Sequence, residues 1–224
     1  MRQRPAFLFD LDGTLVDSVY QHVLSWKDAL DAEGIALSVW RIHRKIGMSG
    51  GLFTNQLLRE IGEEITEEKR ERLRQAHAEA YQTHSRSVVP LPGARELLDT
   101  LTREKLAWAI ATSGRMETAK HNLDRLGVDP EEVAVVTRDA VTYAKPEPDL
   151  FIAAAERLGV PIEGSMVIGD SIWDMLAAQR CRALGVGLLS GGYGGEELER
   201  AGAFRVYEDP AGMLDHLDEV GGRT

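Results

Sequence analysis

The sequence predicts an α/β protein in which helices cover a parallel sheet, with an additional helical unit inserted early in the chain. Short apolar runs alternate with longer stretches of helical period, as expected for buried parallel strands joined by helices. One long stretch breaks this alternation and carries helical patterns alone. With 224 residues, 43% of them hydrophobic, the chain is long and apolar enough for one large core with such an insertion.

The predicted strands are short apolar runs, each too short to be a free-standing helix. They recur at intervals that leave room for a helix between most of them. They are Ala6–Phe9, Ala107–Ala111, Val133–Val136, Met166–Ile168 and Leu184–Leu188.

Helices are predicted between these strands from apolar spacing and from glycines at their ends. Apolar residues of Met116–Leu126 fall on one face, and Gly127 follows where a left-handed C-cap is favoured. Residues Leu150–Leu158 repeat the pattern with Gly159. Pro92 is expected to open a helix that turns three leucines inward.

The stretch from Leu15 to Val88 contains helical patterns and no convincing strand. Glu67 and Glu68 suit the first turn of a helix that reaches toward Tyr81. We therefore predict a core domain of residues 1–14 and 89–224 and an inserted helical domain of residues 15–88. The first inserted helix has an apolar stripe of Val19, Val23, Trp26 and Leu30.

Composition restricts the partners. The formal net charge of −10 repels the backbone of nucleic acid and gives no basic stretch for a membrane surface. No apolar run approaches the length of a membrane span. The lone Cys181 cannot form an internal disulfide, and its apolar surroundings predict a buried structural thiol. We expect a cytoplasmic protein that binds neither nucleic acid nor membrane; monomer and homodimer both stay open.

The first predicted strand runs directly into Asp10-Leu11-Asp12-Gly13. Open parallel sheets bind ligands at the carboxyl ends of their strands. An isolated Asp-x-Asp is most often a solvated turn. Here, however, it follows a buried strand, and Gly13 lets the backbone turn tightly enough to bring both carboxylates around one small volume.

Further polar residues occupy equivalent positions. Thr112, Ser113 and Gly114 follow the second predicted strand and offer donors to a phosphoryl oxygen, although Thr112 could equally cap the next helix. Lys145 lies between Ala144 and Pro146, where its ammonium group could neutralise developing charge. Taken alone, it would be a surface lysine.

Asp170 follows the strand Met166–Ile168, and Asp174 comes four residues later. In isolation, Asp170 would be interpreted as a helix cap. Four such signals meeting at one edge of one sheet favour an active site, because together they provide a nucleophile, a second acid, hydroxyl donors, a cation and metal-binding acids.

These segments resemble the four motifs of the haloacid dehalogenase superfamily, in its phosphatase branch with a helical cap inserted after the first motif. The resemblance extends from Ala6 to about Leu217. It implies a Rossmann-like three-layer core with a central parallel sheet and a cap that closes over the active site. It also implies a phosphoric monoester hydrolase acting on a small phosphorylated metabolite, such as phosphoglycolate or a sugar phosphate.

The same resemblance implies roles for the motif residues. Asp10 would attack phosphorus and form an aspartyl-phosphate, and Asp12 would act as general acid and then as general base. A Mg²⁺ ion would be held by Asp10, the Asp12 backbone carbonyl and Asp170. Asp174 would orient Lys145 or a metal-bound water.

The phosphate oxygens would be bound by Thr112, Ser113, Gly114 and Lys145. Asp12 disfavours a dehalogenase, because halide displacement needs no acid at that position. The main alternative is a phosphomutase resembling β-phosphoglucomutase, which has residues matching His22 and Trp26.

The cap loop disfavours the mutase. Gly47-Met48-Ser49 resembles the mutase loop and Gly47 is a candidate substrate contact, but Gly50 stands where mutases place a phosphate-binding arginine. Met116 likewise replaces a phosphate-binding asparagine. Arg44 or Lys45 could supply a substitute charge, and His22 is a further candidate contact.

A third hypothesis is a catalytically idle member whose metal site serves binding or regulation. Each group that turnover requires is present in the sequence, and a non-enzyme would tolerate the loss of at least one. The sequence therefore favours an active enzyme.

Overall fold

The structure, a computed structural model, describes residues 5–60, 62 and 66–222. These residues form a six-stranded parallel sheet with the order β3-β2-β1-β4-β5-β6. The predicted α/β class with a central parallel sheet is confirmed. The strands are β1 (Phe7–Phe9), β2 (Trp108–Ala111), β3 (Val135–Val136), β4 (Met166–Gly169), β5 (Leu184–Leu188) and β6 (Ala203–Tyr207).

The five predicted strands are all present, with bounds shifted by two residues at most. The edge strand β6 was not predicted from the sequence, because Phe204 and Arg205 in its middle are exposed and no buried apolar run marks it. An edge strand with one solvated side lacks the continuous apolar pattern of the central strands.

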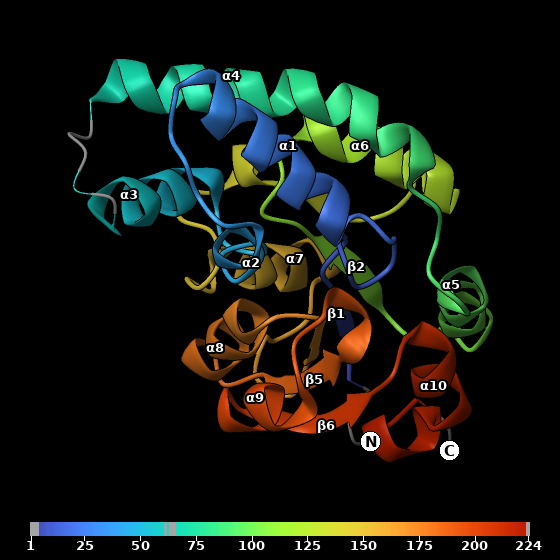
Figure 1. Cartoon of the computed structure of the whole chain (residues 1–224). Helices are drawn as coiled ribbons and strands as arrows, with labels where there is room; N and C mark the ends of the chain where they lie inside the picture. The colour runs from blue at the N-terminus through green and yellow to red at the C-terminus, as the bar shows by residue number, and fades with distance from the viewer. Residues whose placement is uncertain (1–4, 61, 63–65, 223–224) are drawn as a thin grey trace.

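Helices cover both faces of the sheet and create the three layers that were expected. In β1, Phe7 and Phe9 pack into one hydrophobic cluster and Leu8 into the other, because successive side chains of a strand point to opposite faces. Figure 1 shows α5 and α10 on one side of the strands and α7 and α8 on the other. The core helices are α5 (Ala94–Arg103), α6 (Met116–Leu126), α7 (Asp149–Leu158), α8 (Ile172–Arg180), α9 (Gly195–Arg200) and α10 (Pro210–Asp215).

The glycine signals are confirmed. Gly127 and Gly159 adopt left-handed φ values of 85° and 68° directly after α6 and α7. Pro92 does not open α5. The helix begins at Ala94 after a left-handed Gly93 (φ 72°), where a β-carbon would lie 2.5 Å from Ala211 Cα. The close approach of α10 therefore determines where α5 starts.

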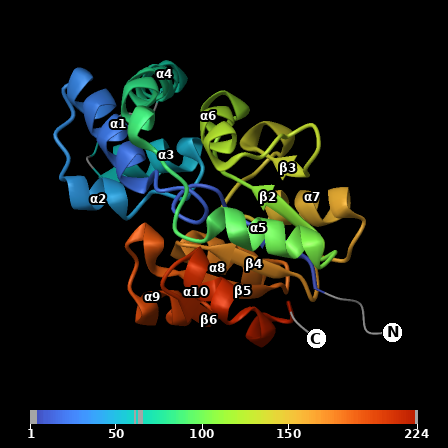
Figure 2. The same ribbon diagram turned by 90° about the vertical axis from the view of Figure 1, so that its right-hand side faces the viewer.

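Between residues 15 and 88, the described residues form helices and no strand beyond isolated bridges of Val16. The helices have a hydrophobic cluster of their own, which contains Val23, Leu30 and Phe53. Figure 2 shows them gathered away from the sheet. The division into two domains stays a prediction. The helices are α1 (Val19–Ala32), α2 (Val39–His43), α3 (Gly50–Glu60) and α4 (Glu67–His84).

The chain crosses between the two regions along paired segments. The backbone N–H of Asp17 donates to Val89 O at 2.9 Å, and that of Leu91 donates to Leu15 O at 3.0 Å. Cys181 is buried. None of the described helices combines the length and apolar character that crossing a membrane requires. Single 3-10 turns are η1 (Ser85–Ser87), η2 (Arg138–Ala140), η3 (Leu189–Gly191) and η4 (Leu217–Val220).

Candidate active site

The register of the central strands brings the motif residues to one edge. Phe9 of β1 is level with Ile110 of β2 and Ile168 of β4, so the residues that follow these strands emerge side by side. The backbone N–H of Asp10 donates to Ile168 O at 2.8 Å and continues the ladder to the first site residue. The candidate site therefore lies where parallel sheets bind ligands.

Lys145 forms the electrostatic centre of this site. Its ammonium group contacts Asp10 Oδ1 and lies 2.8 Å from Asp174 Oδ1, and all three side chains are at most 3% exposed. Burial disfavours the charged ammonium, yet the two carboxylates outweigh it and raise the pKa of Lys145. Lys145 is thus a fixed cation beside Asp10, not the surface lysine that the sequence alone would suggest.

Asp174 connects this cation to helix α8. Its Oδ2 accepts hydrogen bonds from the backbone N–H of Ser171 (3.1 Å) and from Ser171 Oγ (2.6 Å), which forms a capping box. The N-cap of α8 is therefore Ser171, and Asp170 does not serve as the helix cap. One oxygen of Asp174 accepts the hydrogen bonds from Ser171 at the start of the helix, and the other contacts Lys145.

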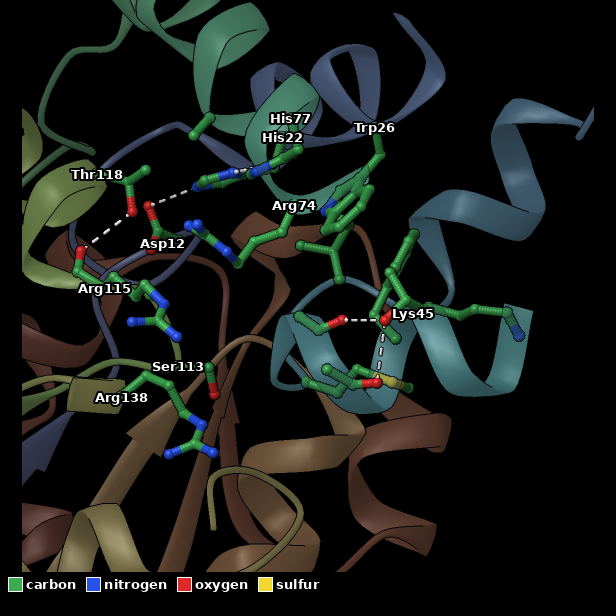
Figure 3. Close-up of a pocket in the computed structure, with 18 of the residues that line it drawn as sticks. Asp12, His22, Trp26, Lys45, Arg74, His77, Ser113, Arg115, Thr118 and Arg138 are labelled. Carbon is green, nitrogen blue, oxygen red and sulfur yellow. Dashed lines mark hydrogen bonds and ion pairs between the residues drawn. The ribbon is translucent and has the colours of Figure 1, made fainter. Parts of the chain in front are cut away.

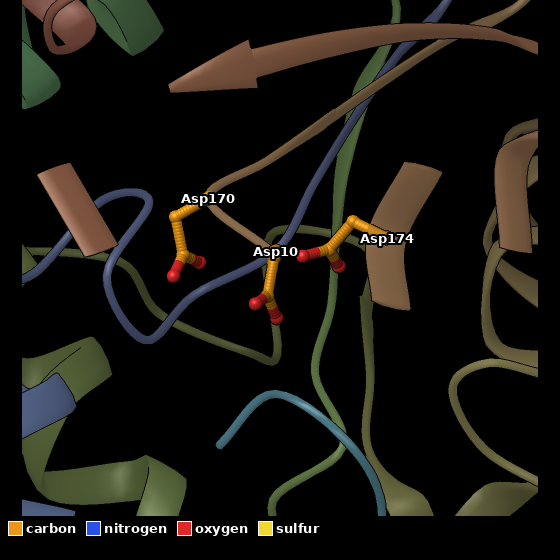
Figure 4. A group of neighbouring side chains, drawn as sticks. All are labelled: Asp10, Asp170 and Asp174. Atoms are coloured by element: carbon orange, nitrogen blue, oxygen red, sulfur yellow. The ribbon is translucent and has the colours of Figure 1, made fainter. Parts of the chain in front are cut away.

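Three buried aspartates suit a divalent cation. Oxygens of Asp10, Asp170 and Asp174 all lie within 4.8 Å of one another (Figure 4). Burial raises the pKa of Asp10 to about 7 and holds that of Asp170 well above its ordinary value, and the neighbouring carboxylates add to both effects. Three carboxylates face the single ammonium group of Lys145, and oxygen ligands with excess negative charge fit a hard cation such as Mg²⁺. Both oxygens of Asp174 are engaged, Oδ1 by Lys145 and Oδ2 by Ser171, whereas Lys145 contacts one oxygen of Asp10, so Asp10 and Asp170 could hold such an ion more readily than Asp174.

Glycine and threonine hold Asp170 in place. Thr14 Oγ1 donates to Asp170 Oδ1 at 3.0 Å. A β-carbon on Gly191 would lie 1.7 Å from Asp170 Oδ2, so the backbone after β5 can approach only because residue 191 is glycine.

Asp12 is surrounded by hydrogen-bond donors. Its Oδ1 accepts from Ser18 Oγ (2.7 Å) and Asn122 Nδ2 (2.8 Å), and it lies 3.3 Å from His22 Nε2. Burial favours the neutral acid, but His22, Ser18 and Asn122 outweigh it and lower the pKa of Asp12 to about 2. In this conformation Asp12 is therefore a carboxylate at neutral pH.

His22 belongs to a stack of rings that the sequence did not predict. Its Nδ1 lies 3.2 Å from His77 Nε2, and its ring stacks on Tyr81 with centroids 4.0 Å apart. Asn122 donates to the Tyr81 hydroxyl at 2.7 Å as well as to Asp12. The four-residue spacing of His77 and Tyr81 on α4 was a signal for one shared face; nothing in the sequence marked Asn122.

A hydrogen bond between Thr112 and Gly114 stabilises the loop after β2. Thr112 Oγ1 accepts from the backbone N–H of Gly114 (3.0 Å) and lies 3.4 Å from Asp12 Oδ2. The N-cap of α6 is Arg115, so Thr112 does not cap that helix. Ser113 Oγ donates to Gly47 O at 3.1 Å, which joins two expected phosphate contacts to each other.

A cavity of about 270 Å³ separates the sheet edge from the inserted helices. Lys45 lines it and binds Glu60 at 2.6 Å. Arg44, the other proposed substitute for the missing mutase arginine, does not line it. Arg44 forms an ion pair with Glu197 and its guanidinium carbon lies 4.2 Å from the centroid of the Tyr193 ring. Figure 3 shows a group of arginines on the opposite wall.

A parallel α/β sheet with a buried aspartate–lysine cluster beneath a helix-covered cavity is typical of an enzyme whose acidic site could hold a metal ion. The chain belongs to the haloacid dehalogenase-like hydrolases, whose family model matches residues 5–182. This confirms the resemblance that the motifs indicated. The relatives described next are phosphatases, and the chain is a phosphatase of this family.

Two relatives and two solved structures illustrate the similarity. Hexitol phosphatase A of Escherichia coli is 33% identical over 186 residues, covering 80% of this chain and 82% of that protein. A phosphoglycolate phosphatase of Agrobacterium fabrum is 28% identical over 193 residues, covering 84% and 81%. A hydrolase from Pseudomonas syringae has 61% identity and a TM-score of 0.95, covering 98% and 100%. The β-phosphoglucomutase of Clostridium difficile shares the fold, with 20% identity, a TM-score of 0.84 and 97% of each chain covered.

Proposed function

We propose that this protein is a Mg²⁺-dependent phosphatase that hydrolyses a small phosphomonoester through an aspartyl-phosphate on Asp10. The observation that carries the proposal is the contact of Lys145 with both Asp10 and Asp174, next to Asp170, in a buried cluster whose Asp10 lines the cavity. This arrangement aligns a carboxylate nucleophile with a fixed cation and a set of metal-binding oxygens.

In the first step, a carboxylate oxygen of Asp10 forms a bond to phosphorus while the bond to the leaving oxygen breaks. Asp12 gives its proton to that oxygen. The donors around Asp12 favour its carboxylate form, so the acid role requires the incoming phosphate charge to raise its pKa. In the second step, a water oxygen forms a bond to phosphorus and gives its proton to Asp12, while the bond from phosphorus to Asp10 breaks and releases inorganic phosphate.

The remaining residues bind charge. Lys145 and the loop from Thr112 to Gly114 stabilise the phosphoryl oxygens, where a loose transition state carries its negative charge. A Mg²⁺ ion held by Asp10, the Asp12 carbonyl and Asp170 would neutralise further phosphoryl charge. Asp174 keeps Lys145 oriented.

The substrates of the relatives suggest the class of ester. The names of two of them indicate hexitol phosphates and phosphoglycolate as substrates. We propose a metabolite of this size, phosphoglycolate-like or sugar-phosphate-like, since the cavity of about 270 Å³ holds a small molecule.

The test is release of inorganic phosphate from a panel of small phosphomonoesters, with Mg²⁺ and with a chelator. We expect release that depends on Mg²⁺ and that falls ~10³-fold or more in Asp10→Asn, because the amide cannot attack phosphorus. Circular dichroism checks that the variant is folded. Normal phosphate release by the folded variant would refute the nucleophile assignment.

A phosphomutase stays the second candidate, since a mutase shares the fold and His22 lies 3.3 Å from Asp12. A sugar 1-phosphate with a trace of the bisphosphate should then yield the 6-phosphate isomer. Free phosphate as the sole product excludes the mutase. A protein that turns over none of these esters would be an idle, ligand-binding member.

A further inference from the structure

Four arginines line the active-site cavity: Arg70, which is held by Asn55 and Glu67, and three others that come from different elements. Arg74 comes from α4, Arg115 follows the loop after β2, and Arg138 lies just after β3. In Figure 3 their guanidinium groups occupy the side of the cavity where Ser113 lies, away from Lys45. We call these three residues the arginine wall. Glu67, Glu71 and Glu117 line the same cavity, so the informative feature is which arginine lacks a carboxylate partner.

Arg138 is the least compensated of the three. Its guanidinium donates to the Val141 carbonyl, and it forms no ion pair with any residue in the described part of the chain. Its backbone N–H donates to Gly114 O at 3.0 Å, so Arg138 is anchored to the loop that is expected to bind the phosphate. A half-buried cation with donors to spare, fixed beside that loop, is poised to bind an anion.

The other two arginines have partners that water can reach. Arg115 Nη1 lies 3.0 Å from Asp139 Oδ1, and Arg74 pairs with Glu71. Both pairs lie at the cavity, since Arg74, Glu71 and Arg115 all line it. Each guanidinium has five N–H donors, and one carboxylate leaves several free.

The arginine wall lies away from the loop position where mutases carry their phosphate-binding arginine. Here that position is Gly50, and Lys45 is engaged by Glu60. A second negative group on the substrate would therefore find unmatched positive charge at Arg138 and not at the cap loop.

We propose that Arg138, supported by Arg115 and Arg74, forms a subsite for a second anionic group of the substrate. The natural substrate is then a phosphomonoester whose other end carries a carboxylate or a second phosphoryl group, not a phosphorylated neutral alcohol. This inference rests on the proposed phosphatase function. Arginine suits both anions, because its planar fork donates two parallel hydrogen bonds to either.

The test compares three phosphate esters with the same three-carbon chain. Their far ends carry a methyl group (propyl phosphate), a carboxylate (the phosphate ester of 3-hydroxypropionate) or a second phosphate (1,3-propanediol bisphosphate). The wild type should show a higher kcat/KM for one or both doubly anionic esters than for propyl phosphate. Which of the two is preferred identifies the anion. In Arg138→Gln, that preference should fall by about ten-fold or more, mainly through KM.

Arg200→Gln is the matched control, since Arg200 pairs with Glu196 on α9 and both side chains are about 80% exposed. It should keep the wild-type preference. If Arg138→Gln does not fold, Arg115→Gln at an exposed position replaces it, with a smaller expected loss in the same direction.

Three outcomes are distinguishable. Loss of the preference in the arginine variants supports the subsite. Release of phosphate from all three esters without preference, or a preference unchanged in Arg138→Gln, overturns the subsite and leaves the phosphatase intact. No release from any phosphomonoester, including the wider panel, overturns the phosphatase and the subsite with it.

Discussion

The buried cluster of Asp10, Lys145 and Asp174, here called the floor, and the outer walls of the cavity both contain ion pairs, but in different surroundings. Asp10 is the floor residue that lines the cavity itself. At the floor, Lys145 contacts two aspartates, and these three side chains are at most 3% exposed. At the walls, the pair of Arg74 and Glu71 has exposures of 37% and 57%. Since buried charges must be matched within the protein, removing one member of the floor leaves the others without compensation. A pair on the wall can instead exchange its partner for water or ligand.

This difference in burial suits the floor to the chemical reaction and the walls to recognition of the substrate. The floor is a closed set in which each carboxylate has a fixed partner, which suits a reaction whose geometry must not vary. The walls consist of pairs that can open, which suits recognition of a substrate that arrives and leaves. The comparison is tested by substituting one buried and one more exposed charged residue of the same type and measuring the effect of each.

The largest effect is expected for Lys145→Met. It leaves Asp10 and Asp174 buried without a cation, and we expect the free energy of unfolding near neutral pH to fall by about 3–5 kcal/mol. Urea denaturation measures it. The control is Lys27→Met, which removes an exposed lysine paired with Asp31 and should cost less than about 1 kcal/mol. Equal losses in the two variants would show that burial does not distinguish the floor from the surface.

A moderate effect is expected from pH and metal together. Burial raises the pKa of Asp10 from 3.8 to about 7 in the metal-free protein. Between these values the folded state retains a proton that the unfolded state has lost, so stability falls as pH rises from about 4 to 7. Mg²⁺ binds the ionised carboxylate and replaces that proton.

We therefore expect Mg²⁺ to raise the melting temperature by more at about pH 8 than at about pH 5, by a few degrees. Thermal unfolding with Mg²⁺ and with a chelator measures the difference. Asp170→Asn should reduce the Mg²⁺ effect, whereas Asp31→Asn, on the exposed surface of α1, should preserve it. A Mg²⁺ shift that does not vary with pH would contradict the linkage to Asp10.

The part of the site formed by Asp10, Thr112 and Asp170 was predictable from the sequence because each of these residues follows a strand. Once Phe9, Ile110 and Ile168 are assigned to neighbouring parallel strands, the residues after them must meet at one edge. The same rule applied to β3 points to Thr137 and Arg138, which sequence reasoning did not use. The family resemblance supplied the roles, which a spacing pattern cannot.

The helical region was less predictable because its contacts depend on packing between distant helices. Asn122 of α6, for example, donates both to Asp12 and to Tyr81 of α4, which lie far from it in the sequence. Arg44 and Lys45 are neighbours in the sequence, yet one binds Glu197 and the other faces the cavity. The direction of a side chain on a short helix is set by what the helix packs against, and that information lies far along the chain.

The smallest effect is expected where the inserted helices contact the core through Arg44 and Glu197. These side chains are 37% and 42% exposed, so water competes with the ion pair, and the stacking of Arg44 on Tyr193 persists without Glu197. A double-mutant cycle of Arg44→Ala and Glu197→Ala should give a coupling below about 1 kcal/mol in the free energy of unfolding. Neither substitution should change kcat by more than about two-fold, since both residues lie outside the cavity. A coupling free energy as large as the loss of stability in Lys145→Met would mean that this exposed ion pair contributes as much as the buried floor. Exposure would then not explain the difference between the two regions.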